Sequence, residues 1–179
     1  MIVQDKLQSK ESLWSEEYIN GLNSDTTRAK LFIIGYPCEV GARNYEGRAG
    51  LDRGPDSFRE IIDLTKLPSD PATFSSYLEK PLTDSVRLID CGNIHVDQGK
   101  ASELRDSVMF VAQEELRKFV AQILSKVENS FVFVIGGSDD LTLALLKAVD
   151  DGATTGEGSA ILVDPSIDVK EKHRSRVSR

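Results

Sequence analysis

Four short runs of mostly apolar residues alternate along this chain with segments of helical periodicity, and the alternation restricts the fold more than any other feature. The runs are LFIIG (31–35), VRLID (86–90), FVFVI (131–135) and AILVD (160–164). Apolar runs of this length, bounded by turn residues, are typical of strands buried on both faces of a parallel sheet. Strands that alternate with helices are joined by crossovers and pair in parallel. The sequence therefore predicts an α/β fold, a three-layer αβα arrangement around a parallel sheet.

Two predicted helices precede the second apolar run. Trp14, Tyr18 and Leu22 lie four residues apart, which predicts a short amphipathic helix over 11–22. We expect it to pack onto the domain from an N-terminal helical extension, residues 1–28. Further along, Gly54-Pro55 places proline at a helix start, and DSFREIIDL follows with Phe58, Ile61 and Ile62 on one face. A loop rich in Pro, Ser and Asp, residues 68–84, then leads to the second run.

The longest helical pattern extends over residues 101–127. Its apolar positions recur at helical spacing: Leu104, Val108, Val111, Leu116, Phe119, Ile123 and Val127. DLTLALLKAV (140–149) predicts another helix before the last apolar run. Only 15 residues follow that run, with no further strand or helix pattern. We therefore expect residues 1–179 to form a single, partial domain that corresponds to the first half of a larger α/β domain.

Composition and charge restrict the partners. A chain of 179 residues with 40% hydrophobic content suffices for one domain with a core. Its net charge of −7 is spread along the sequence, which argues against nucleic acid and anionic membranes as partners. The apolar runs are too short to span a bilayer and the N-terminus lacks the apolar core of a signal peptide, so we expect a cytoplasmic location. Cys38 and Cys91 lack metal-binding spacing and are predicted to be reduced thiols.

Two of the apolar runs lead directly into acidic residues, in FVFVIGGSDDL (131–141) and ILVDPSIDVK (161–170). Ligands of α/β proteins bind at the carboxyl edge of the sheet, which makes Asp139, Asp164 and Asp168 candidate site residues. Two simpler interpretations remain open. Gly136-Gly137 is also consistent with a tight turn capped by Ser138 or Asp139, and Asp164 and Asp168 with ordinary turn or cap residues.

The stretch GYPCEVGARNYEGRAGLDRGPDSFREII (35–62) resembles the ureohydrolase superfamily of arginase, agmatinase and formimidoylglutamase. In that family the first strand ends in a G-x-P turn, an Arg- and Gly-containing loop follows, and a G-P pair opens a helix with Arg in its first turn. The matching positions are Gly35, Pro37, Gly41, Arg48, Gly50, Gly54, Pro55 and Arg59. R-N-x-x-G-R-x-G, from Arg43 to Gly50, resembles the formimidoylglutamase branch. We expect Arg48 and Arg59 to be structural, closing loops through forked hydrogen bonds.

The two acidic segments extend this resemblance. IGGSDDL stands in the place of the family's G-G-D-H or G-G-x-N-D motif, so that Asp139 replaces the first metal-ligating His. VDPSIDVK is similar to D-A-H-x-D, with Asp164 and Asp168 retained and Ser166 in the position of the second His. The resemblance implies two Mn²⁺ ions, which in the family are also held by a later D-x-D-x-x-D motif that this sequence does not contain. It thus implies an arginase-like fold with an incomplete C-terminal half.

The implied chemistry is metal-assisted hydrolysis. Paired Mn²⁺ ions lower the pKa of a shared water and direct the hydroxide at the planar carbon of an amidine or guanidine. Each ion needs about five or six ligands, whereas this chain offers Asp139, Asp164 and Asp168, with Ser166 a poor neutral ligand. The resemblance therefore implies hydrolysis of a linear C–N bond in a formimidoylglutamate-like small molecule, impaired in this chain. It identifies neither catalytic nor substrate-binding residues.

Two alternatives stand beside this enzyme. The first is a catalytically degenerate arginase-like protein, a pseudoenzyme that acts as a binding or oligomerisation partner, alone or with an intact homologue. The second is a truncated fragment without an independent role. Neither histidine is a favoured ligand. His95 follows the second apolar run, where a lone loop histidine is more often a solvated or packed side chain, and His173 lies in the C-terminal KEKHRSRVSR, which hardly matches the corresponding substrate-loop motif of the family.

Overall fold

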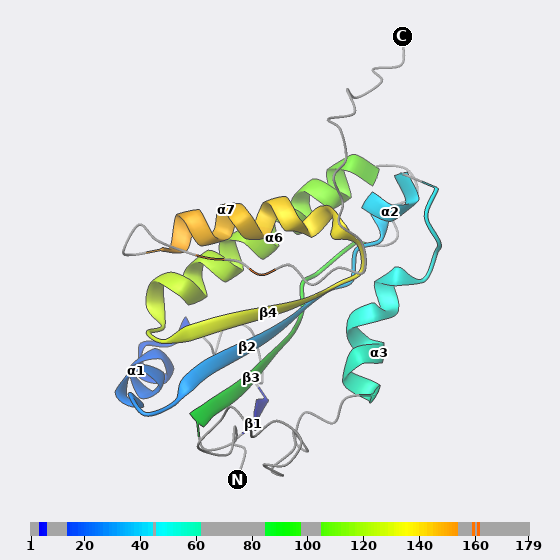
Figure 1. Ribbon diagram of the computed structural model, residues 1–179. Coiled ribbons are helices and arrows are strands. Elements are labelled where there is room, and N and C mark those ends of the chain that lie inside the picture. Colours follow the sequence, from blue (N-terminus) through cyan, green and yellow to red (C-terminus); the bar gives the residue numbers. More distant parts are fainter. Residues whose placement is uncertain are drawn as a thin grey trace.

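The structure is a computed structural model that describes residues 4–6, 14–44, 46–61, 85–97, 105–153, 159 and 161. Its centre is a sheet of four strands in the order β1-β3-β2-β4, and every pair is parallel (Figure 1). The strands are β1 (Gln4–Lys6), β2 (Ala29–Tyr36), β3 (Val86–Asn93) and β4 (Ser130–Gly136). The predicted parallel sheet is confirmed for the first three apolar runs. The short β1 was not predicted, because three residues are too few for a recognisable pattern.

Helices cover both faces of this sheet. One face packs against α1 (Glu16–Ser24), α6 (Arg105–Lys126) and α7 (Thr142–Gly152), whereas α3 (Gly54–Ile61) lies on the other (Figure 1). Alternate residues of β2 point to the two faces. Phe32 and Ile34 belong to the larger apolar cluster with α6, and Ile33 belongs to a smaller one with Phe58 of α3. The three-layer αβα arrangement is therefore as predicted.

The predicted N-terminal helix is present as α1. Ser15 caps it by accepting a hydrogen bond from the Tyr18 N–H at 3.3 Å, and Leu22 is fully buried. The Trp14 ring packs edge-on against Phe119 of α6, with ring centroids 5.4 Å apart. This helix is thereby attached to the side of the domain formed by α6 (Figure 1).

Two predicted apolar positions turn out to be exposed. Val111 of α6 is 62% exposed, and the core position in that turn is Ala112 instead. Val108, Ala112 and Leu116 continue a strict four-residue spacing that faces the sheet, which leaves Val111 to one side. Ile61, the last residue of α3, is 83% exposed because the helix ends there and no described element covers it.

Several predictions lie outside the described residues. These include the loop over 68–84, Ile62, Leu104 and the strand over 160–164, of which only Ile161 is described; Ile161 is exposed and belongs to no strand. Among the described helices, none is long and apolar enough to cross a membrane. The Cys38 and Cys91 thiols are buried.

Candidate functional site

The carboxyl ends of β2 and β4 meet in a closely packed turn. At Gly137 a Cβ atom would lie 2.6 Å from the Cys38 carbonyl oxygen and 2.9 Å from that of Leu51, so no larger residue fits. The Gly137 N–H also donates to the Tyr36 carbonyl at 2.8 Å. The sequence places Gly-Gly here because the backbone that follows β4 lies directly against the loop that follows β2.

Asp140 accepts hydrogen bonds from three elements within this packed region. Its Oδ2 lies 3.0 Å from the Tyr36 hydroxyl and 3.2 Å from Gln113 Nε2, and its Oδ1 contacts the Ser138 hydroxyl. Gln113 Nε2 also donates to the Asp140 carbonyl at 2.8 Å. Gly41 at the start of α2 (Val40–Asn44) is equally constrained, because a Cβ there would lie 2.5 Å from Oδ1. Asp140 therefore holds together β2, α2, α6 and the turn after β4.

Two ionisable groups close to Asp140, the Tyr36 phenol and the Cys38 thiol, are neutral at neutral pH. Burial, together with the negative charge of Asp140, raises the pKa of the Tyr36 phenol. Burial likewise raises the pKa of the Cys38 thiol, and the Asp140 charge adds to the shift. At neutral pH neither side chain is an anion, so neither is activated as a nucleophile.

Asp139 is exposed at the carboxyl edge, where the sequence predicted it. It opens the short 3₁₀ turn η4 (Asp139–Leu141), and its carbonyl accepts from the Thr142 hydroxyl at 2.9 Å as α7 begins. Ser138 occupies the predicted cap position, but its hydroxyl contacts Asp140 and the Cys38 carbonyl instead of capping the turn. Asp164, Ser166 and Asp168 lie outside the described residues, so their proximity to Asp139 stays a prediction.

Arg59 has the structural role that was predicted for it. Its Nε and Nη2 donate to the two Asp90 oxygens, each at 2.9 Å, and Nη2 also donates to the Gly92 carbonyl at 3.0 Å. Nη1 donates to Asn93 Oδ1 at 2.6 Å. This forked arrangement fastens α3 to the carboxyl end of β3.

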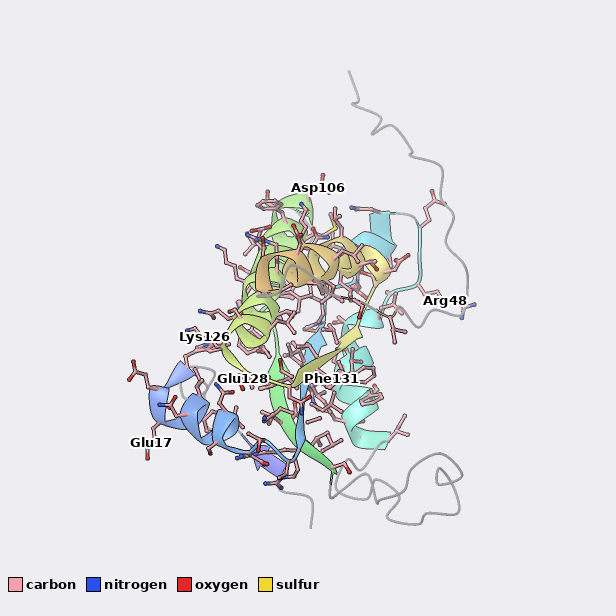
Figure 2. The ribbon with its side chains drawn as sticks, turned by 60° about the vertical axis from the view of Figure 1, so that its left-hand side comes forward. Glu17, Arg48, Asp106, Lys126, Glu128 and Phe131 are labelled. Carbon is pink, nitrogen blue, oxygen red and sulfur yellow. The ribbon has the colours of Figure 1, made fainter. Side chains whose placement is uncertain are left out.

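Arg48 does not share that role. Its side chain is exposed, has no hydrogen bond or ion pair within the part of the chain that the structure describes, and projects outward from the loop between α2 and α3 (Figure 2). The loop is held by Glu39, which is only 4% exposed, accepts from the N–H groups of Gly50 at 2.6 Å and Leu51 at 3.1 Å, and pairs with Arg43. The expected structural role of Arg48 is therefore wrong, and Glu39 provides it.

Glu39 is ionised although it is buried. Burial alone would raise the pKa of its carboxyl group, but the Gly50 N–H, the Arg43 guanidinium and the Leu51 N–H together lower it below the ordinary glutamate value. Glu39 and Asp140 were not predicted as site residues from the sequence. The signal for both was the same as for Asp139: an acid within a few residues of a strand's carboxyl end.

The sequence model of the arginase family matches residues 29–178. The chain belongs to the arginase family. It is similar to formimidoylglutamase of Clostridium tetani, with 28% identity over 156 residues, which are 83% of this chain and 38% of that protein. It is also similar to formimidoylglutamase of Staphylococcus haemolyticus, with 25% identity over 77% of this chain and 37% of that protein. This arginase-family chain thus spans about two fifths of the length of the curated relatives it matches.

Two solved structures are similar to this arginase-family chain. Formiminoglutamase of Trypanosoma cruzi has a TM-score of 0.48 and 26% identity, over 75% of this chain and 41% of that one. Formimidoylglutamase of Bacillus subtilis has a TM-score of 0.46 and 15% identity, over 72% of this chain and 35% of that one.

Arginase-family membership implies in general a binuclear Mn²⁺ centre, and the described donors do not fit one. No group of three or more His, Cys, Asp or Glu side chains suited to a metal ion occurs among the residues that the structure describes. The Asp140 carboxylate is engaged by three neutral donors, and His95, the only described histidine, is exposed on the segment after β3. Asp139 is the one predicted ligand whose position is described.

Proposed function

We propose that this arginase-family chain acts on a linear amidine resembling formimidoylglutamate, with hydrolytic activity impaired by the loss of metal-ligating histidines. The observation that carries the proposal is the exposed Asp139 at the carboxyl edge of an arginase-family domain whose similar relatives include formimidoylglutamases. An exposed carboxylate at this position suits a cation, either an amidinium group, which a carboxylate binds through paired hydrogen bonds, or a hard divalent metal. We further propose a cytoplasmic location.

The number of carboxylates that this chain offers determines the metal content that we expect. With Asp164 and Asp168, Asp139 would provide three carboxylates, enough for one weakly held hard cation and too few for two tightly held Mn²⁺ ions. Catalysis through a shared water requires both ions. We therefore propose at most one Mn²⁺ per chain and turnover at least about 100-fold below that of an intact formimidoylglutamase.

The proposal is tested by two measurements on the same preparation. The purified chain is loaded with excess Mn²⁺, freed of loose metal and analysed for Mn per chain, with Asp139→Ala and Asp164→Ala as controls. Formamide and ammonia release from formimidoylglutamate, and urea release from arginine and agmatine, are then compared with an intact homologue. Two Mn²⁺ per chain with full turnover would refute the impairment. No Mn²⁺ and no turnover would refute the hydrolase function itself.

The exposed edge strand β4 favours a second function, in which the chain is a catalytically degenerate protein that binds a partner. Within the described residues β4 pairs with β2 alone, and its side chains Phe131 and Phe133 are 59% and 43% exposed (Figure 2 marks Phe131). Exposed apolar edge strands pair readily with other chains. Under this proposal the chain forms homo-oligomers or joins an intact homologue. Co-purification with such a homologue, lost in Phe131→Lys, would support it, and a strictly monomeric chain that captures no homologue would exclude it.

A further inference from the structure

The outer side of β4 carries backbone groups that no described strand pairs with. β4 is the last strand of the sheet and lies beside β2 (Figure 1). The Asn129 carbonyl accepts from the Lys30 N–H at 2.9 Å, and the Gly137 N–H donates to the Tyr36 carbonyl at 2.8 Å. Because backbone direction alternates along a strand, the odd-numbered residues of β4 bond to β2. The even-numbered residues point their N–H and C=O groups away from the sheet: Ser130, Val132, Val134 and Gly136.

Two other strands that could pair with this side of β4 are poor candidates. Ile161, the one described residue of the run over 160–164, is 92% exposed and lies in no strand. The opposite edge of the sheet is β1, which has three residues and includes the charged Asp5 and Lys6. Pairing of β4 with β1 of another copy would also leave an open edge at each end of the assembly and build fibres.

β4 is complementary to a second copy of itself. Its sequence, SFVFVIG, contains no charged residue, so two chains that each have a net charge of −7 do not repel each other at this strand. A two-fold contact between identical edges pairs the strands antiparallel, and outward groups bond only where even-numbered residues face each other. The register that pairs the whole strand is centred on Phe133. In it, Val132 faces Val134 of the second copy, and Ser130 faces Gly136.

The same register brings exposed aromatic side chains together. Phe131 and Phe133 are 59% and 43% exposed, on the sheet face that carries α3. Phe133 lies opposite Phe133 of the second copy in a non-hydrogen-bonded pair, the kind in which side chains approach most closely. Phe131 lies opposite Ile135, and aromatic cross-strand pairs stabilise a sheet. The pairing therefore satisfies the open backbone groups and covers exposed apolar surface at once.

We infer that β4 pairs antiparallel with β4 of a second copy, which joins two sheets into one continuous sheet. The inference rests on the second proposed function, a chain that binds a partner, and it names the partner as the chain itself. The carboxyl edges of the two sheets face opposite directions in this arrangement. The Asp139 side chains of the two copies consequently lie at opposite ends of the contact.

Disulfide crosslinking tests the register. Phe133→Cys and Phe131→Cys are purified reduced and oxidised mildly, and the covalent dimer is followed on non-reducing gels, with the wild type as control for the buried Cys38 and Cys91. Cα atoms of a non-hydrogen-bonded pair lie about 4.5 Å apart, within the disulfide range of about 4.4–6.8 Å. The two copies of position 131 are displaced by about 13 Å along the strands. Phe133→Cys should therefore crosslink at least about tenfold faster, although chance collision favours the more exposed position 131.

A double variant keeps this test valid if Phe133→Cys folds poorly. Phe131 faces Ile135 of the second copy, so Phe131→Cys combined with Ile135→Cys should crosslink between chains where Phe131→Cys alone does not. Sedimentation equilibrium adds a measurement without cysteines. Phe133→Asp places two like charges opposite each other and should weaken the wild-type dimer at least about tenfold. A mixture of Phe133→Asp and Phe133→Lys chains should restore the dimer, because position 133 faces itself.

The outcomes separate this inference from the proposed function on which it rests. Equal crosslinking at positions 131 and 133, or a wild type that stays monomeric, would overturn the pairing of β4 with itself. If the chain does not self-pair but co-purifies with an intact homologue, the partner function stands and only this inference fails. If it does neither, both fail.

Discussion

Replacing Arg59 with methionine tests how α3 is held against the sheet. The Arg59 side chain is 19% exposed and that of Asp90 is 15% exposed, so this ion pair is mostly shielded from water. Two parallel bonds of 2.9 Å join the guanidinium to the carboxylate, and further bonds reach Asn93 Oδ1 and the Gly92 carbonyl. Methionine preserves most of the aliphatic stem and removes every one of these donors, which leaves Asp90 with a desolvated charge.

The expected loss follows from these contacts. A hydrogen bond to a charged group contributes about 1.5–3 kcal/mol, and removing one partner of a buried pair costs about 3–5 kcal/mol. Because Asp90 gains some access to water when Arg59 is shortened, we expect Arg59→Met to lower the free energy of unfolding by about 2–4 kcal/mol. Lysine retains the charge but not the fork, so Arg59→Lys should lose about 1–2 kcal/mol. Either loss is measurable against a typical domain stability of about 5–15 kcal/mol.

Arg48 offers a matched control for this experiment. Arg48→Met is the same chemical change at an exposed position without a partner in the described part of the chain, so its effect should stay within about 0.5 kcal/mol. Both variants are unfolded in urea and followed by far-UV circular dichroism, with the slope of the transition checked for a common two-state process. Equal stabilities of Arg59→Met and Arg48→Met would refute the reasoning, because the fork would then contribute nothing beyond an exposed arginine.

Three further predictions concern other described positions. Glu39→Gln should destabilise the protein by about 1–3 kcal/mol at pH 7. Since the pKa of Glu39 is lower in the folded state, its contribution is present above the ordinary value of 4.5 and is lost as the pH falls through the folded pKa, so urea unfolding should show this difference shrinking in acid. Lys30 of β2 is 1% exposed, so Lys30→Met, which keeps most of the buried aliphatic stem, should change the free energy of unfolding measured in urea by less than about 1 kcal/mol. Phe131→Lys places a charge on the β4 edge and should reduce light scattering on concentration without a loss above about 1 kcal/mol.

The parts of the fold that the sequence predicted are those governed by local pattern. β2, β3 and β4 follow from runs of mostly apolar residues, and α6 from apolar residues at helical spacing. Val111 was predicted as a core position, but Ala112 is buried instead, for a physical reason that the sequence does not reveal. A small residue can be buried where the helix lies close to its neighbours, and hydrophobicity alone favours the larger valine.

The site was predictable to a lesser degree, because its contacts join distant residues. Tyr36 is 104 residues from Asp140, and Gln113 is 27 residues from it. Nothing in the spacing of an isolated acid reveals which donors will surround it, so Asp139 and Asp140 look alike in the sequence. The motif resemblance favoured Asp139 because it stands where relatives have a histidine, and the role of Asp140 became visible only from the packing of α6 and β2 against the turn.

Three described acids at the carboxyl edge of the sheet stabilise the fold. Glu39 after β2, Asp90 in β3 and Asp140 after β4 are each surrounded by donors from other elements, whereas Asp139 is exposed. An acid whose oxygens already accept hydrogen bonds must give them up before it can bind a cation, at the cost of leaving its donors unpaired. We therefore expect substitutions at Glu39, Asp90 and Asp140 to change stability more than substitution of the exposed Asp139.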